Sequence, residues 1–263
     1  MANKAVLYGE DYLSHFNAKA YLETYYSKSV FTAEKSLTEV FTLKKMHEFY
    51  TETAGFASHS ASILEFGGGA VVSHLISAAP YASRIVLTDY TPAWLEALDS
   101  WKRGDPQAHN WGPFFDYVVR VLEQNPHESA AEKRAKELKA RLCSLLPCDV
   151  HAEKPIGDGY DRSFDVVSSS LCLETACSTH DEFREAVRKL AGFLKTEGWF
   201  VLNGGLEERC YAVGKDTTFF SLPLTKDIIK EALENAGIEL VDFEILPRYK
   251  GNVAAFHAVG QLK

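Results

Sequence analysis

Three consecutive glycines follow a short apolar run and form the first segment with a recognisable chemical pattern. Residues Ser62–Phe66 are apolar enough for a buried strand, and Gly67–Gly69 come directly after them. Such a turn lets the backbone approach a ligand closely and directs main-chain N–H groups toward it. A tight strand–helix turn without any ligand is the plain alternative. The pattern therefore indicates a site for a nucleotide-like molecule.

The spacing of these glycines does not fit a nicotinamide dinucleotide. That fingerprint requires a third glycine at position 72, where this chain has Val72. Instead, Glu65 lies just before Gly67 and gives an acidic-x-G-x-G pattern. A carboxylate there can hold the ammonium end of S-adenosylmethionine (SAM), directly or through the backbone of the turn. We therefore expect SAM as the cofactor.

Two further acidic residues follow predicted strands. Asp89 ends the run that starts at Arg84, about twenty residues beyond the glycines, and one carboxylate can accept hydrogen bonds from both hydroxyls of a ribose. A helix cap or a turn is the alternative role for Asp89. Asp149 and Val150 follow a third short run. An acidic side chain beside a backbone N–H is able to bind the amino edge of adenine.

Alternating strands and helices must position these residues. We predict strands over Ser62–Phe66, Arg84–Asp89, Cys148–His151, Phe164–Leu171, Gly198–Asn203, Ile238–Ile245 and Val253–Val259, and helices over His74–Ala79, Pro92–Trp101, Glu132–Arg141, Asp181–Leu194 and Ile228–Ala236. This order predicts an α/β fold: a doubly wound, mostly parallel seven-stranded sheet of the Rossmann-like type, with a reversed C-terminal edge strand. The loops after Phe66, Thr88, Cys148 and Ser170 then open on one side, where ligands bind.

The first sixty residues are helical in pattern and rich in aromatic side chains. Tyrosines and Phe16 precede an amphipathic stretch from about Ala33 to Phe56. No repeat or low-complexity linker divides the chain. We expect a single domain over 1–263, with a helical cap over 1–60 and an α/β core over 61–263 that carries a polar, helix-rich insertion at 104–146.

Composition excludes several classes of function. The net charge of −8 over 263 residues argues against a large phosphate-binding face, and hence against a nucleic-acid substrate. The five cysteines form no C-x-x-C pair and the nine histidines are scattered, so neither a disulfide framework nor a metal site is predicted. Neither a signal peptide nor a membrane span is indicated. We expect a cytoplasmic monomer that acts on a small molecule.

Six short segments, in order along nearly the whole chain, resemble one family. They are Tyr12–Asn17, Tyr21–Glu23, Thr88–Tyr90, Cys148–Val150, Leu171–Glu174 and Phe220–Leu224. Together they look like the nicotinamide, phenylethanolamine and indolethylamine N-methyltransferase family. The resemblance implies a class I SAM-dependent fold with an N-terminal helical lid, and transfer of a methyl group from SAM to nitrogen.

The resemblance also implies residue roles. On the cofactor side it places Tyr12, Tyr21 and Tyr26 at the carboxylate end of SAM, and Gly67 and Gly68 at its methionine portion. It places Asp89 at the ribose, Tyr90, Asp149 and Val150 at the adenine, and Ser170 near the sulfonium. On the substrate side it places Leu171, Glu174, Glu208, Tyr211 and Ser221. Without the resemblance, the tyrosines could equally be a helix packing face, and the two glutamates could be exposed charges.

The two glutamates fit the chemistry of an amine substrate. A protonated amine has no lone pair, so Glu174 and Glu208 can bind the cation and relay its proton as catalytic carboxylates. The segment Gly205–Tyr211 looks closer to the phenylethanolamine members, and Gly204 stands where nicotinamide-type members carry an aspartate. We therefore expect an aryl-alkyl amine substrate. A pyridine-type N-methyltransferase and a catalytically weak SAM-binding scaffold remain the alternatives.

Two positions depart from the family pattern at expected cofactor contacts. Ser73 stands where the family usually has a tyrosine, in the helix predicted after the glycine turn. Trp94 stands where it usually has an asparagine, shortly after the ribose aspartate. Both substitutions bear on how this chain would contact SAM.

Overall fold

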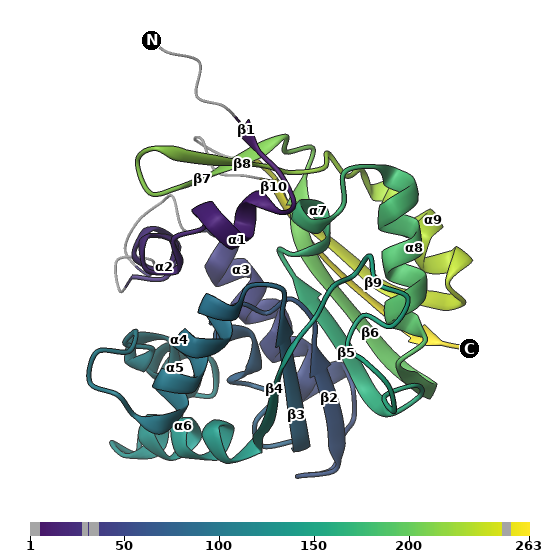
Figure 1. Cartoon of the computed structure of the whole chain (residues 1–263). Coiled ribbons are helices and arrows are strands. Elements are labelled where there is room, and N and C mark those ends of the chain that lie inside the picture. The colour runs from purple at the N-terminus through teal and green to yellow at the C-terminus, as the bar shows by residue number, and fades with distance from the viewer. Residues whose placement is uncertain (1–5, 28–30, 32–36, 249–253) are drawn as a thin grey trace.

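A seven-stranded sheet crosses the centre of the protein, in the order β4-β3-β2-β5-β6-β10-β9. Figure 1 shows the computed structural model, which describes residues 6–27, 31, 37–248 and 254–263. The strands are β2 (Ala61–Glu65), β3 (Ala82–Asp89), β4 (Leu142–Pro147), β5 (Phe164–Ser170), β6 (Leu194–Leu206), β9 (Ile238–Leu246) and β10 (Ala254–Leu262). Neighbours from β4 to β6 are parallel, whereas β10 runs antiparallel to both β6 and β9. The predicted fold class is confirmed, with β10 as the reversed C-terminal strand beside the edge strand β9.

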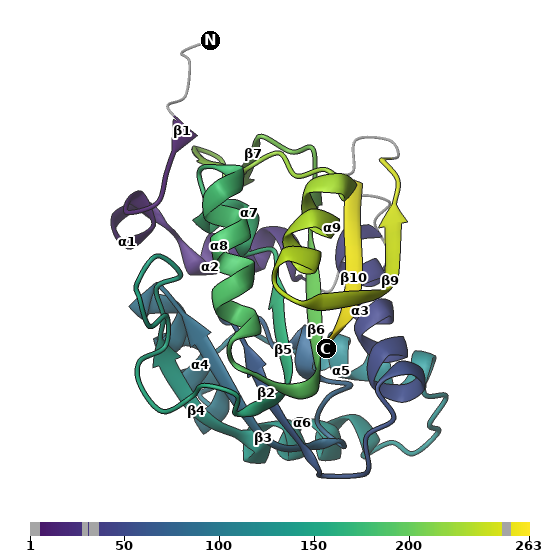
Figure 2. The ribbon, with the colours of Figure 1, turned by 90° about the vertical axis from the view of Figure 1, so that its right-hand side faces the viewer.

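Helices cover both faces of the sheet because successive side chains of each strand point to opposite faces. Leu64 and Val167 pack with the helices on one face, whereas Ile63 and Val166 pack with those on the other. The first face is covered by α8 (His180–Ala191) and α9 (Lys226–Asn235), which lie in front of the sheet in Figure 2. The second face is covered by α3 (Leu37–Glu48), α4 (Pro92–Arg103), α5 (Gly112–Asp116) and α6 (Ala130–Arg141).

Local sequence signals set the ends of these helices. The Thr179 side chain accepts a hydrogen bond from Glu182 N at the start of α8, and Thr225 does the same for α9. Pro92 occupies the first turn of α4, where its missing N–H costs nothing, and Gly104 ends that helix in the left-handed conformation. These helices therefore begin and end close to their predicted bounds.

Two predicted elements are wrong in detail. The helix expected over His74–Ala79 is a single 3₁₀ turn, Ser73–Leu75, followed by further turns, because the short buried connection meets Pro80 before a regular helix can form. The third strand is not Cys148–His151 but the apolar run Leu142–Pro147, and Cys148 begins the loop that follows it. Residues 33–36 and Val253, at the starts of two predicted elements, lie outside the described residues.

A second, small sheet and the N-terminal helices lie over one end of the main sheet. The small sheet has the order β1-β8-β7 and consists of β1 (Val6–Leu7), β7 (Cys210–Val213) and β8 (Thr217–Phe220). With α1 (Asp11–His15) and α2 (Ala18–Tyr25), it surrounds the region where α7 (Leu173–Ala176) follows β5 (Figure 1). Strands this short carry little periodicity, and the sequence did not predict them. A five-residue π-helix, Phe49–Thr53, extends α3.

No helix among the described residues is long and apolar enough to cross a membrane.

Candidate active site

The glycine turn is tied to the carboxyl end of the neighbouring strand. Gly67 and Gly69 have φ angles of +65° and +58°, in the left-handed region that favours glycine. Gly68 N donates to Thr88 O at 3.0 Å, and Gly69 N donates to Asp89 Oδ2 at 2.9 Å. The backbone of the turn is therefore fixed against the end of β3, and the predicted Gly67, Gly68 and Asp89 are neighbours.

Asp89 is well placed to present a carboxylate to a ligand. Its second oxygen, Oδ1, accepts a hydrogen bond from Thr91 N at 2.8 Å, and the Thr91 side chain also hydrogen-bonds to the carboxylate. Burial raises the pKa of Asp89 to about 6, against the opposing effect of the hydrogen bonds from Thr91 and Gly69. Above that pH the ionised carboxylate is able to accept hydrogen bonds from the hydroxyls of a ligand.

Gly67 leaves no room for a side chain. A Cβ built at Gly67 would lie 2.1 Å from Sγ of Cys172, and one built at Gly68 would lie 2.7 Å from Cγ of Glu65. The loop after β5 therefore packs directly onto the glycine turn. Glycine is required at position 67 for two separate reasons, its φ angle and this contact.

We expect Gly67→Ala to lower the free energy of unfolding by about 2–4 kcal/mol, because backbone strain and overpacking add. Gly157→Ala is the matched control: Gly157 has a φ of +83° and nothing within 4 Å of a built Cβ. It should lose only about 1 kcal/mol, from backbone strain alone. Urea unfolding of both variants measures the difference, and equal losses would contradict the packing argument.

Glu65 and His74 form a buried polar pair beneath the turn. Oε2 of Glu65 accepts a hydrogen bond from the Ser168 hydroxyl, whereas Oε1 has no donor among the described residues. His74 Nδ1 is also without a partner there and lies 3.8 Å from that Oε1. A buried carboxylate oxygen without a donor is costly, so this position suits an ammonium group or a water molecule. The unpaired oxygen, the glycine backbone and Asp89 together fit the ammonium, methionine and ribose parts of SAM.

An aromatic cluster from the N-terminal helices covers this region. The hydroxyls of Tyr12 and Tyr211 are hydrogen-bonded to each other, and the Tyr12 ring lies 4.4 Å from Phe219 between centroids. Tyr21 contacts Tyr26, whose ring packs 5.4 Å from that of Trp111. Burial raises the pKa of Tyr12, Tyr21 and Tyr26, so these phenols stay protonated at neutral pH and can donate hydrogen bonds. The predicted tyrosines are thus brought together with Tyr211.

Trp94 links this cluster to the glycine turn, which the sequence did not predict. Its indole lies 3.5 Å from the position of a Cβ at Gly69, and its centroid lies 5.2 Å from Phe16 and 5.5 Å from Tyr21. Trp94 is 5% exposed. The large side chain that departs from the family pattern therefore fills space between the turn and the lid helices.

The three residues predicted for adenine lie on adjacent loops. Cys148 N donates to Asp89 O at 3.0 Å, which places the loop after β4 beside the end of β3. Asp149 accepts a hydrogen bond from His151 N at 2.8 Å and stays partly exposed, while Val150 is buried. Tyr90 is 38% exposed. This side of the candidate site is open to solvent.

Glu174 lies buried where β5 ends. It follows Ser170 and Leu171, and Leu171 has a φ of +54°, rare for a residue with a side chain. Oε1 of Glu174 accepts a hydrogen bond from Gly205 N at 2.9 Å. Burial nevertheless raises the pKa of Glu174 to about 7. A carboxyl group that gains and loses a proton near neutral pH is suited to acid–base chemistry.

The other predicted substrate residues follow β6. Ser221 is buried and its N–H donates to Arg209 O at 3.0 Å, while Leu222 N donates to Glu174 O at 2.6 Å. Glu208 is bonded to the guanidinium of Arg248. An incoming ammonium would have to compete with that guanidinium, so the Glu208 carboxylate is less available to a substrate cation than the Glu174 carboxylate.

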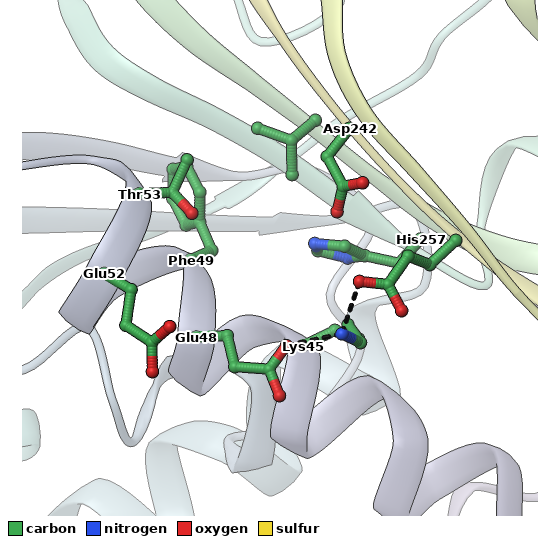
Figure 3. Close-up of a pocket in the computed structure, with 9 residues that line it drawn as sticks. Lys45, Glu48, Phe49, Glu52, Thr53, Asp242 and His257 are labelled. Carbon is green, nitrogen blue, oxygen red and sulfur yellow. Dashed lines mark hydrogen bonds and ion pairs between the residues drawn. The ribbon is translucent and has the colours of Figure 1, made fainter.

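A separate cavity of about 260 Å³ lies between α3 and the C-terminal strands and contains none of the predicted site residues (Figure 3). Lys45 bonds to Glu48 and to Glu244 within it, each at 2.5 Å. The other lining residues are Phe49, Glu52, Thr53, Asp242, His257 and Val259. They are scattered over the chain, so no local pattern indicated the cavity. Within the described residues, no cluster of three or more His, Cys, Asp or Glu could hold a metal ion.

Known proteins of similar sequence are N-methyltransferases. The chain is 31% identical to indolethylamine N-methyltransferase of Mus musculus, over 92% of this chain and 89% of that protein. It is 31% identical to nicotinamide N-methyltransferase of Homo sapiens, over 90% and 87%. It is 30% identical to phenylethanolamine N-methyltransferase of Macaca mulatta, over 72% and 67%.

Solved structures of methyltransferases share the fold. Magnesium protoporphyrin IX methyltransferase from Synechocystis PCC 6803, with bound SAM, has a TM-score of 0.61 at 9% identity and covers 96% of this chain and 94% of its own. The 1,6-didemethyltoxoflavin-N1-methyltransferase of Burkholderia thailandensis has a TM-score of 0.54 at 16% identity, over 100% and 93%. The sequence profile of one family matches residues 4–258. Because this match spans nearly the whole chain, the chain belongs to the NNMT/PNMT/TEMT family.

Proposed function

We propose that this chain transfers the methyl group of SAM to the nitrogen of an aryl-alkyl amine. Family membership supplies the reaction class, SAM-dependent N-methylation. The observation that carries the choice of an amine is Glu174, a buried carboxyl with a pKa of about 7 beside the aromatic lid. A pyridine nitrogen is already unprotonated at neutral pH and needs no such group.

SAM would be held along the carboxyl ends of β2, β3 and β4. Asp89 would accept both ribose hydroxyls, the loops with Tyr90, Asp149 and Val150 would border the adenine, and Gly67 and Gly68 would face the methionine portion. Ser170, Tyr12, Tyr21 and Tyr26 would complete the methionine end. When bound, SAM supplies a methyl group on a sulfonium centre, whose leaving group is already activated.

The residues of this chain would prepare the amine for an in-line displacement. The ammonium gives its proton to the Glu174 carboxylate, which also accepts a hydrogen bond from Gly205 N through Oε1. The nitrogen lone pair is then available. Tyr211, Leu171 and Ser221 would hold the ring so that the amine nitrogen can reach the near-attack distance of about 3–3.5 Å from the methyl carbon, and the lid would exclude water. Glu208 would attract the cation at the entrance.

A substrate panel tests the proposal. With SAM present, we expect kcat/KM for a phenylethylamine or a tryptamine to exceed that for nicotinamide at least about tenfold, a ratio that needs only ~1.4 kcal/mol of discrimination. The reverse order would favour the pyridine-type alternative. A calorimetric titration with SAM completes the test, since SAM binding without turnover of any amine or pyridine in the panel would support the scaffold alternative.

We also propose that residues 1–263 act as one domain, as a monomer in the cytoplasm, on a small molecule rather than on nucleic acid. The net charge of −8 supports this choice of substrate, because it repels a phosphate backbone.

A further inference from the structure

A buried hydrogen-bond chain joins the cavity of Figure 3 to the candidate active site. Its centre is Asn203 on β6, which is 1% exposed. Nδ2 of Asn203 lies 3.0 Å from Oγ of Ser170 and 3.4 Å from Sδ of Met46, and Oδ1 lies 2.6 Å from Nδ1 of His257. Both the nitrogen and the oxygen of this amide are therefore hydrogen-bonded to neighbouring side chains.

Which group donates in each of these hydrogen bonds follows from the chemistry of the four side chains. A thioether sulfur can only accept, so the amide group beside Met46 must be the NH₂. The amide oxygen then faces His257, and because an oxygen of that kind only accepts, Nδ1 of His257 carries a hydrogen. The second N–H of Asn203 donates to Ser170. The Ser170 hydroxyl is thus used as an acceptor, and its own hydrogen remains to be donated elsewhere.

His257 lies at the far end of this series of hydrogen bonds and keeps one protonation state. The ring is 2% exposed and lines the cavity next to Lys45 (Figure 3). Burial, and then the charge of Lys45, lowers the pKa of His257 to about 3, so the ring is neutral at physiological pH. With the hydrogen on Nδ1, the neutral ring acts as a fixed donor to Asn203.

Asn203 also fixes the backbone next to Ser170. Asn203 and Ser170 are paired across β5 and β6, and Leu171 N donates to Asn203 O at 2.9 Å. The same residue therefore supports the left-handed Leu171 and the Ser170 hydroxyl, both at the point where β5 opens into the candidate site.

We propose that Asn203, oriented by Met46 and His257, is a positioning residue that keeps the Ser170 hydroxyl a hydrogen-bond donor toward an acceptor atom of SAM. This inference rests on the proposed SAM site. A serine hydroxyl alone can turn either way, whereas here the N–H of Asn203 donates to the oxygen, so the hydroxyl hydrogen is turned away from Asn203 and is left for another acceptor.

Substituting an isosteric group that can only accept tests the direction. In Asn203→Asp at pH 8, the introduced carboxylate takes the Ser170 hydrogen, and the donor toward SAM is lost. Ser170→Ala removes the same donor outright. We expect each variant to raise the Kd for SAM about tenfold, as for one hydrogen bond to a charged group. The double variant should bind SAM no more weakly than the weaker-binding single variant, because both substitutions remove the same interaction.

Calorimetry of SAM binding, without substrate, gives the measurement. Asn235→Asp, an exposed position at the end of α9, adds the same charge and should leave the Kd unchanged. The proposal would be overturned if Ser170→Ala had the Kd of the wild-type protein for SAM, or if the fold-increases in Kd of the two single variants multiplied in the double variant. Absence of SAM binding by the wild-type protein would instead sink the proposed function.

A second variant covers the case in which Asn203→Asp does not fold, as judged by its thermal unfolding. His257→Phe keeps a ring of similar size but removes the donor to the amide oxygen. The amide is then free to turn, and we expect the Kd for SAM to rise about threefold while the variant stays folded. A Kd equal to that of the wild-type protein would overturn the positioning role.

Discussion

Replacing Glu174 with glutamine is expected to lower kcat for an aryl-alkyl amine about 100-fold, the lower end of the range for general acid–base catalysis. The amide keeps the shape of the side chain and can still accept from Gly205 N, but it cannot take a proton. Because Glu174 is not among the residues proposed to hold SAM, the Kd for SAM should stay within about twofold. Steady-state kinetics and calorimetry measure the two effects separately.

The pH dependence gives this prediction a second signature. The pKa of Glu174 is raised from 4.5 to about 7, so kcat/KM of the wild-type enzyme should rise as pH increases through about 7, and the Gln variant should lack this rise. Between pH 4.5 and 7 the folded protein holds a proton that the unfolded chain has released. Stability from this group therefore falls as pH rises through that window, and Glu174→Gln removes the fall.

Glu208→Gln is the control for Glu174. Its partner Arg248 already occupies the carboxylate, so we expect a loss of about threefold, mainly in KM. Activity of Glu174→Gln within about twofold of the wild-type value would refute the catalytic role. Equal losses for the two glutamates would instead indicate a shared electrostatic effect on the cation.

Asp89→Asn should weaken SAM binding about 100-fold, or ~2.7 kcal/mol. The amide replaces one acceptor oxygen by an NH₂ group, which accepts a hydrogen bond neither from Gly69 N nor from a ribose hydroxyl. The turn that faces the methionine portion loses its anchor at the same time. Calorimetry measures the Kd, and thermal unfolding separates a weakened site from a weakened fold.

The same carboxylate predicts how SAM binding depends on pH. Burial raises the pKa of Asp89 to about 6, so affinity for SAM should decline as pH falls below about 6, and the Asn variant should show no such decline. Asp181→Asn is the control, since the Asp181 side chain is 95% exposed at the start of α8 and lies outside the residues proposed to hold SAM. A loss for Asp181→Asn as large as that for Asp89→Asn would contradict the assigned ribose position.

Local patterns predicted the sheet and the glycine turn because their causes are local. Strand and helix periodicity lies within each segment, and the glycines and Asp89 meet because they lie at the carboxyl ends of two neighbouring parallel strands. The 3₁₀ turn after the glycines was missed for a related reason. The apolar residues from Ala70 to Ala79 have no clear period, and burial of the whole segment, rather than its propensity, decides its shape.

The contacts that complete the site join residues that are far apart in the sequence. Trp94 meets Phe16 and Tyr21, Asn203 meets His257, and Arg248 meets Glu208. No periodicity encodes such pairs, and each side chain alone looks like an ordinary core or surface residue. Trp94 is one example: in the sequence it only departs from the family pattern at an expected cofactor contact, whereas in the structure it packs between Gly69 and the rings of Phe16 and Tyr21.

The lid has a consequence for the exchange of the cofactor. Tyr12 bonds to Tyr211 of β7 and its ring packs against Phe219 of β8. Tyr25 donates to Ala212 O at 2.8 Å, so α1 and α2 are held against the small sheet. If the methionine portion of SAM binds beneath these tyrosines, that end of the cofactor would be enclosed while the contacts hold, whereas its adenine end would face the open side of the site. Exchange of SAM for S-adenosylhomocysteine would then require α1 and α2 to move away from the small sheet.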